Sequence, residues 1–149
     1  MTSKTIVIGC DHAARALKAE ILSHCESMGY TVLDVGTHSD ASCDYPVIAV
    51  EAANHITEGN ATHGILICGT GLGMSMSANK VNGIRCALCS EPYSAQMSRE
   101  HNDANMLAIG ARVVGTELAK MIVTTWLNAE FHGERHQRRV DMITAIENT

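Results

Sequence analysis

The sequence predicts an α/β protein in three layers, a five-stranded parallel sheet with helices on both faces. Two observations carry this prediction: five short apolar runs are typical of strands, and segments of helical periodicity separate them along the whole chain. Such an alternation implies a parallel sheet that is covered on both sides. The chain has 149 residues, 46% hydrophobic and 18% charged, as expected for one globular domain over residues 1–149.

The predicted strands are short and apolar, and turn residues separate them from the helices. They are residues 5–8, 31–35, 64–67, 84–88 and 105–110. The commonest arrangement of five such strands is the order 2-1-3-4-5, in which a crevice opens between the carboxyl ends of strands 1 and 3. Cys10-Asp11-His12 and Cys68-Gly69-Thr70 follow these two strands. We therefore expect a ligand site there.

Helices are predicted from apolar periodicity and from start and stop residues. The first runs from Ala14 to Gly29, the second from Asp44-Tyr45-Pro46 to Gly59, and the third follows a glycine-rich loop through Lys80. Pro92 opens the fourth, and the fifth has apolar residues at helical spacing up to Trp126. Beyond Gly133, a terminal helix is predicted over about 136–148.

Composition excludes several classes of function. Sixteen acidic and eleven basic residues give a net charge of −5, which argues against general nucleic-acid binding. No apolar run is long enough to span a membrane, and the apolar run after Lys4 is too short for the core of a signal peptide. We expect a cytoplasmic protein whose six cysteines are free thiols. Cys86 and Cys89 lie three apart in a predicted strand, so they point to opposite faces and form neither a redox pair nor half of a zinc site.

The loop from Cys68 to Gly73 has the sequence Cys-Gly-Thr-Gly-Leu-Gly after a strand and before a helix. Its spacing differs from the G-x-G-x-x-G of dinucleotide sites and favours a backbone cradle for an anion or oxyanion over a simple tight turn. Cys68 is either an inert core residue or, beside the start of a helix, a reactive base or nucleophile. The residues alone leave both open.

Three further groups carry chemistry. Asp11-His12 lies at the expected crevice, and His101-Asn102 precedes strand 5, where a solvated helix C-cap is the simpler interpretation. Arg135 and Arg139 share one helix face, a geometry suited to clamping a phosphate as well as to a solvated surface.

These blocks together resemble the type B ribose-5-phosphate isomerases. The resemblance covers nearly the whole chain and rests on Gly9-Cys10-Asp11-His12, Asp44-Tyr45-Pro46, Cys68-Gly69-Thr70-Gly71-Leu72-Gly73, Ala78-Asn79-Lys80, Ser90-Glu91-Pro92-Tyr93-Ser94-Ala95, His101-Asn102-Asp103 and Gly133-Glu134-Arg135-His136-Gln137-Arg138-Arg139. It implies a Rossmann-like homodimer that interconverts ribose 5-phosphate and ribulose 5-phosphate through a 1,2-enediolate, without a metal or organic cofactor.

The resemblance also implies roles for individual residues. Cys68 is the base, His101 opens the furanose ring, and Thr70 assists a backbone cradle. Substrate contacts are Asp11, His12, Gly69, Thr70, Gly71, Leu72, Gly73, Asn102, Arg112, Arg135 and Arg139. Family members without the cysteine have a glutamate after the loop, where this chain has Met74. Rival functions are an allose-6-phosphate or galactose-6-phosphate isomerase, a nucleotide-binding oxidoreductase, which the loop spacing disfavours, and a non-catalytic sugar-phosphate sensor.

The length of the predicted helix from Pro92 bears on the assembly of the protein. The helix from Pro92 runs away from the carboxyl edge, and nine residues carry His101 about 14 Å from that edge, too far to serve its own chain's Cys68. If both residues serve one reaction, as the resemblance implies, a partner chain must bring His101 to Cys68, so we expect a homodimer with shared active sites, in which the C-terminal helix packs on the partner.

Overall fold

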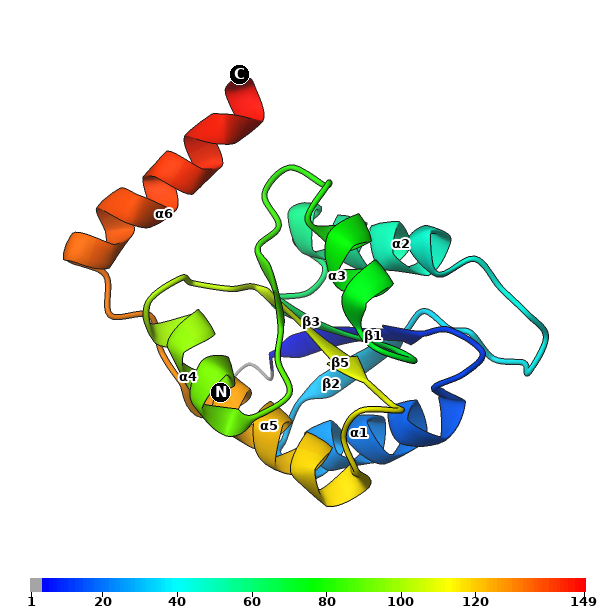
Figure 1. The fold of residues 1–149 in the computed structure, drawn as a ribbon. Coiled ribbons are helices and arrows are strands. Elements are labelled where there is room, and N and C mark those ends of the chain that lie inside the picture. Colours follow the sequence, from blue (N-terminus) through cyan, green and yellow to red (C-terminus); the bar gives the residue numbers. More distant parts are fainter. Residues whose placement is uncertain (1–3) are drawn as a thin grey trace.

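The computed structural model describes residues 4–149 and contains a five-stranded, wholly parallel sheet (Figure 1). The strands are β1 (Thr5–Cys10), β2 (Thr31–Asp34), β3 (His63–Cys68), β4 (Cys86–Leu88) and β5 (Met106–Gly110). The helices are α1 (Arg15–Ser27), α2 (Tyr45–Thr57), α3 (Leu72–Ala78), α4 (Pro92–Glu100), α5 (Thr116–Asn128) and α6 (Arg135–Ala145), followed by a 3-10 turn η1 (Ile146–Asn148). The predicted fold class is confirmed, with element ends within a few residues of those expected.

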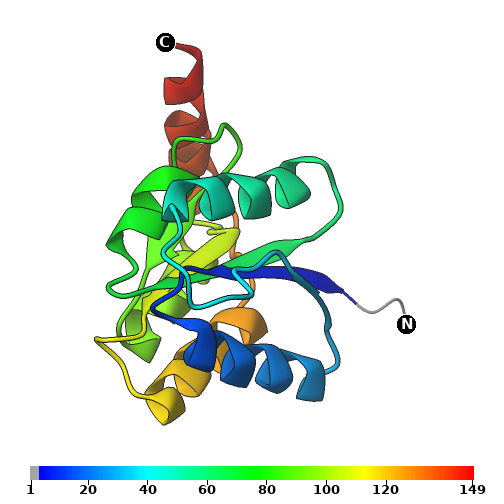
Figure 2. The ribbon, with the colours of Figure 1, turned by 90° about the vertical axis from the view of Figure 1, so that its right-hand side faces the viewer.

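Helices cover both faces of the sheet, as Figure 2 shows edge-on. On one face α1, α4 and α5 pack against the strands, with Trp126 fully buried among them. On the other face α2 and α3 bury small residues such as Ala52 and Ala53. Cys86 packs on the α2 and α3 side and Cys89 on the opposite side, as strand alternation predicts. All six cysteines are free.

The strand order differs from the one expected. It is β2-β1-β3-β5-β4, so the last strand inserts between the third and the fourth. Residues Met106 to Gly110 of β5 are all buried, which suits an interior position, whereas β4 has three residues and exposes Leu88. A short strand at the sheet edge limits pairing with other chains. Both runs look equally apolar in sequence, so periodicity could not separate them.

Helix α6 stands away from the body of the molecule (Figure 1). Val140 is its one buried residue, while Met142, Ile143 and the following Ile146 are exposed. A cavity of about 550 Å³ lies between this helix and the body, with Ile84 and Ile143 in its wall. The predicted terminal helix is therefore present, and the apolar face of α6 is left largely uncovered by the described part of its own chain. No helix among residues 4–149 is both long and apolar enough to cross a membrane.

Strands β3 and β5 meet closely at their carboxyl ends, where Cys68 pairs with Gly110. A Cβ atom added at Gly110 would lie 2.6 Å from the carbonyl oxygen of Thr70 and 2.7 Å from its carbonyl carbon. These are backbone atoms of the glycine-rich loop, so the loop and β5 can approach this closely only with glycine at position 110.

We predict that Gly110→Ala destabilises the protein, because the loop backbone must move to admit the methyl group. The expected cost is about 2 kcal/mol, or a fall of roughly 4–8 °C in the thermal unfolding midpoint at fixed protein concentration. Gly115→Ala is the control, since nothing lies within 4 Å of the added Cβ there. Equal midpoints for the two variants would contradict the tight approach.

Candidate active site

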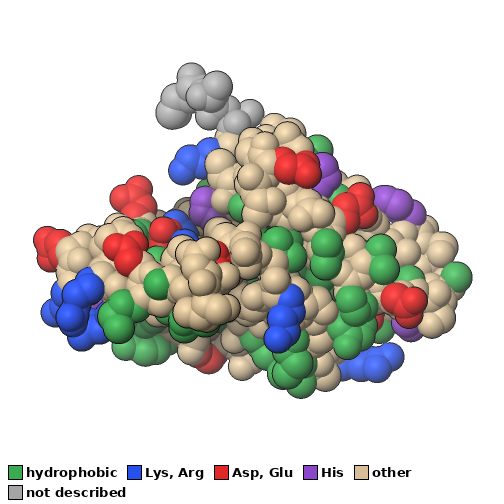
Figure 3. Space-filling model, turned by 90° about the horizontal axis from the view of Figure 1, so that it is seen from above, with side chains coloured by type: hydrophobic (Ala, Val, Ile, Leu, Met, Phe, Trp, Pro, Cys, Tyr) green, Lys and Arg blue, Asp and Glu red, His purple; other side chains and the backbone are tan. Residues whose placement is uncertain are grey.

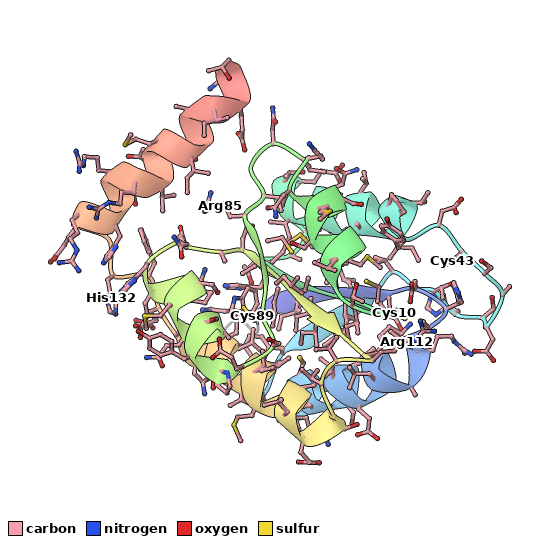
Figure 4. The ribbon with its side chains drawn as sticks, in the orientation of Figure 1. Cys10, Cys43, Arg85, Cys89, Arg112 and His132 are labelled. Atoms are coloured by element: carbon pink, nitrogen blue, oxygen red, sulfur yellow. The ribbon has the colours of Figure 1, made fainter. Side chains whose placement is uncertain are left out.

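The loops after β1, β3 and β5 converge at the carboxyl edge of the sheet. The Asp11 N–H donates to the Ile67 carbonyl at 3.1 Å, the Ala111 N–H to the Cys68 carbonyl at 2.8 Å, and the Arg112 N–H to the Gly69 carbonyl at 3.0 Å. Figure 4 shows Arg112 and Cys10 at this edge. These backbone hydrogen bonds hold Asp11, Cys68 and Arg112, which come from three separate chain segments, beside one another.

Cys68 ends β3 and is 5% exposed. The Gly71 N–H donates to its Sγ at 3.0 Å, which fixes the sulfur against the glycine-rich loop. Other cysteines lie in the core, where burial raises the pKa of Cys10 and Cys89 to about 11 and that of Cys25 and Cys86 to about 12. Those four thiols are therefore held in the protonated form at neutral pH.

Packing constrains two of the loop glycines. Gly71 has φ +81°, and a Cβ there would lie 2.5 Å from Leu88 Cδ1 and 3.0 Å from the Ile109 carbonyl carbon. A Cβ at Gly73 would overlap the ring of Tyr45. At Gly69, by contrast, the added Cβ meets only the Arg112 side chain, at 3.5 Å or more. The tight-turn interpretation thus explains Gly71 and Gly73, whereas packing makes no such demand at Gly69.

Backbone N–H groups remain available along this loop. Helix α3 begins at Leu72, so the N–H groups of Gly73 and Met74 have no carbonyl partner earlier in that helix. The Thr70 hydroxyl oxygen accepts from the Leu72 N–H at 3.2 Å and shapes the turn. The loop can therefore present unpaired donors to an oxyanion beside the Cys68 sulfur.

The segment before α2 borders the same edge. Asp11 is buried and accepts from the Ala13 N–H at 3.0 Å, while His12 is exposed and its Nδ1 accepts from the Cys43 N–H at 3.3 Å. Tyr45 packs its ring on Gly73. Cys43 and Tyr45 are site residues to which the sequence reasoning assigned no role, although Asp44-Tyr45-Pro46 was among the motifs that carried the resemblance.

The remaining predicted site residues lie elsewhere. His101 is the C-cap of α4, and β5 begins shortly after it at Met106, which pairs with Gly64. From there to the Gly110–Cys68 pair is four residues of strand, about 13 Å. Figure 4 accordingly shows His132, whose ring contacts that of His101, on the opposite side of the molecule from Arg112.

The second group gathers around α6. The His101 ring stacks on His136, with centroids 4.1 Å apart and planes at 10°. Arg135 and Arg139 are exposed and form no ion pair with any residue of the described chain. Partial burial, together with the charges of His101, Arg135 and Arg139, lowers the pKa of His136. In Figure 3 one group of basic side chains lies at the α6 end of the molecule, and other basic side chains are spread over the rest of this face. The group at α6 is an electropositive surface suited to a phosphate.

Within one chain, then, the structure brings together Asp11, His12, Cys68, Gly69, Thr70, Gly71, Leu72, Gly73 and Arg112. It places His101, Asn102, Arg135 and Arg139 at the other end of β5. One half holds a thiol beside backbone donors, and the other holds an imidazole beside free arginines.

Comparison with known proteins gives a consistent picture. A family model described as Ribose/Galactose Isomerase matches residues 6–143. Ribose-5-phosphate isomerase B of Escherichia coli strain K12 is 56% identical over 144 residues, 97% of each chain. D-erythrulose-4-phosphate isomerase of Pectobacterium atrosepticum is 45% identical over 145 residues, covering 97% of this chain and 95% of that protein.

A solved structure agrees with these sequence matches. Ribose-5-phosphate isomerase B of Clostridium thermocellum superposes with a TM-score of 0.95 at 53% identity, over 97% of both chains. The sheet, helices and loops of the two proteins thus correspond along almost the whole chain. Their sequence identity is well above the level at which two proteins share only a fold. The chain belongs to the ribose/galactose isomerase family.

Proposed function

We propose that this protein is an aldose-ketose isomerase that interconverts D-ribose 5-phosphate and D-ribulose 5-phosphate. The observation that carries the proposal is the position of Cys68, whose sulfur is held against the backbone donors of the glycine-rich loop in a chain of this family. The relative at 56% identity bears the name of this activity.

The reaction needs a base and a site for negative charge. The Cys68 thiolate takes the proton from C2 of the open-chain aldose, giving a 1,2-enediolate, and returns it to C1 to give the ketose. The proton on the O2 hydroxyl is lost as that oxygen becomes the carbonyl, and O1 gains one. Backbone N–H groups of the loop from Gly69 to Gly73 that are not already paired, that of Gly73 among them, stabilise the enediolate oxygens with the help of Thr70, an effect worth about 3–4 kcal/mol.

The cyclic sugar phosphate must also be opened to its chain form, and its phosphate group must be bound. His101 moves the proton between the anomeric hydroxyl and the ring oxygen, and Asn102, Arg112, Arg135 and Arg139 bind the substrate with Asp11 and His12. Phosphate binding, remote from the reacting carbons, holds C1 and C2 at the base and so contributes to the rate. No step requires a cofactor.

The two halves of this site act together only if a second copy of the chain is present. About 13 Å of β5 separates the two ends at which Cys68 and His101 lie. The exposed apolar residues Met142, Ile143 and Ile146 follow the arginines along the C-terminal segment. We infer a homodimer in which the C-terminal helix packs on the partner and each His101 reaches the other chain's Cys68.

Two further properties belong to the proposal. Six free thiols suit a reducing compartment, so we place the enzyme in the cytoplasm. The 45% identical relative is named for a four-carbon sugar phosphate, so the length of the sugar chain is the property to test. Allose 6-phosphate and galactose 6-phosphate are the competing substrates to compare with ribose 5-phosphate.

Cys68→Ala should bind substrate nearly normally and lose at least about 10²-fold in kcat, because the thiolate acts only in proton transfer. The assay follows ribulose 5-phosphate formation with EDTA present. Cys25→Ala removes another buried thiol, remote from the loop, and should leave kcat unchanged. A Cys68→Ala enzyme with more than a tenth of wild-type kcat would exclude cysteine as the base.

Arg135→Ala combined with Arg139→Ala should raise KM for ribose 5-phosphate, with part of the loss in kcat, because phosphate binding also positions the reacting carbons. Inorganic phosphate should compete with substrate in the wild type and much less in this double variant. Arg138→Ala removes an equal charge from the same turn and should change neither value markedly. Unchanged phosphate inhibition in the double variant would make the arginines a solvated surface.

Shared sites predict complementation between inactive variants. The Cys68→Ala and His101→Asn variants are mixed, unfolded together and refolded. Random pairing makes about half of the dimers mixed, and each mixed dimer has one intact site. Roughly a quarter of wild-type activity should therefore return. Each variant refolded alone is the control. If mixed dimers are present by native mass spectrometry and no activity returns, both residues serve the site of one chain.

A further inference from the structure

We propose that Glu100, His101 and His132 form a binding site for a divalent transition-metal ion of the zinc type. The site goes beyond the isomerase chemistry, which uses no metal. One carboxylate oxygen and one nitrogen from each imidazole lie within 4.8 Å of one another. The His132 Nε2 is 3.7 Å from Glu100 Oε2. Tetrahedral Zn²⁺, with bonds of about 2.0–2.1 Å, places its ligands about 3.3 Å apart, so side-chain movements of about 1 Å would close the site.

The backbone already holds these three residues together. Glu100 ends α4 and His101 is its C-cap, while His132 comes from the segment that joins α5 to α6. The His132 N–H donates to the Glu100 carbonyl at 3.0 Å, which pins that segment to the end of the helix. Figure 4 shows His132 where the chain passes from the body into α6.

Neighbouring side chains orient the ligands. The Gln96 amide donates to Glu100 Oε1 at 2.9 Å, which leaves Oε2 directed at His132. His136 stacks on the face of the His101 ring, and a metal ion binds in the plane of an imidazole, at its edge. No described residue forms a hydrogen bond to either ring nitrogen of His101. Such second contacts commonly fix the orientation of metal ligands.

The donor set indicates the kind of ion. Two imidazoles and one carboxylate leave a fourth position for water, an arrangement typical of zinc sites that are open to solvent, and imidazole nitrogen disfavours magnesium and calcium. The alternative is a plain His132–Glu100 ion pair at 3.7 Å. Arg135 and Arg139 place positive charge near His136, which weakens the binding of a cation at the neighbouring site.

Metal binding would occupy His101. If His101 opens the sugar ring, as the proposed function has it, an ion held there blocks its proton transfer, and Zn²⁺ is a reversible inhibitor. This consequence rests on the proposed function, whereas binding of the ion does not.

Binding is tested first, without activity. Titration calorimetry with ZnCl₂ in a non-chelating buffer should give one bound ion per wild-type chain. His132→Ala and Glu100→Gln should each bind Zn²⁺ at least tenfold more weakly. The control His38→Ala, which removes an exposed histidine elsewhere, should bind Zn²⁺ as the wild type does. Co²⁺ in the same site should lack the intense near-ultraviolet bands of a thiolate ligand. Absence of binding, wild-type affinity in both ligand variants, or thiolate bands would each overturn the site.

Inhibition is tested second. Zn²⁺ should inhibit the wild-type isomerase and EDTA should restore it, whereas His132→Ala should have normal activity in EDTA and need at least tenfold more Zn²⁺ for the same inhibition. Binding of one ion without inhibition would uphold the site and reject the role given to His101. Equal inhibition of wild type and His132→Ala would show that the inhibiting ion lies elsewhere.

Discussion

The close pairing of β3 with β5 is the constraint on which the site depends. Gly110 lies against the backbone of Thr70, and Gly71 lies against the backbone of Ile109 and Gly110. The loop that follows Cys68 is therefore held by backbone contacts on one side. This rigid support fixes the sulfur and the nearby N–H groups before substrate arrives, which is the condition for stabilising charge that develops during a reaction.

The same strand pair also divides the functional residues. In a parallel sheet, the residues that follow the strands lie at one edge, and the residues that precede the strands lie at the opposite edge. Cys68 ends β3 and Arg112 follows β5, whereas His101 precedes β5 and stacks on His136 of α6, the helix that carries the arginines. Under the proposed function, one half supplies the Cys68 base and the other the His101 imidazole, and the proposed homodimer would bring the two together.

Charge is distributed to match this division. The chain has a net charge of −5, yet Arg135, Arg138 and Arg139 project together from one exposed helix. Partial burial and neighbouring positive charges lower the pKa of His136, the imidazole that stacks on His101. This group of basic side chains in an otherwise acidic protein supports the proposed binding of a small phosphorylated substrate.

Much of this could be predicted from the sequence, because it depends on local patterns. Apolar runs and turn glycines determined the α/β class and the extent of the elements, and the length of α4 predicted that His101 lies far from its own chain's Cys68. Other features depend on contacts between distant segments. The strand order was wrong because β4 and β5 are similar apolar runs, and only their burial separates an edge strand from an interior one. The packing of Gly73 on Tyr45 and the meeting of His132 with Glu100 and His101 were likewise decided by the tertiary structure, since no periodicity links residues so far apart in the chain.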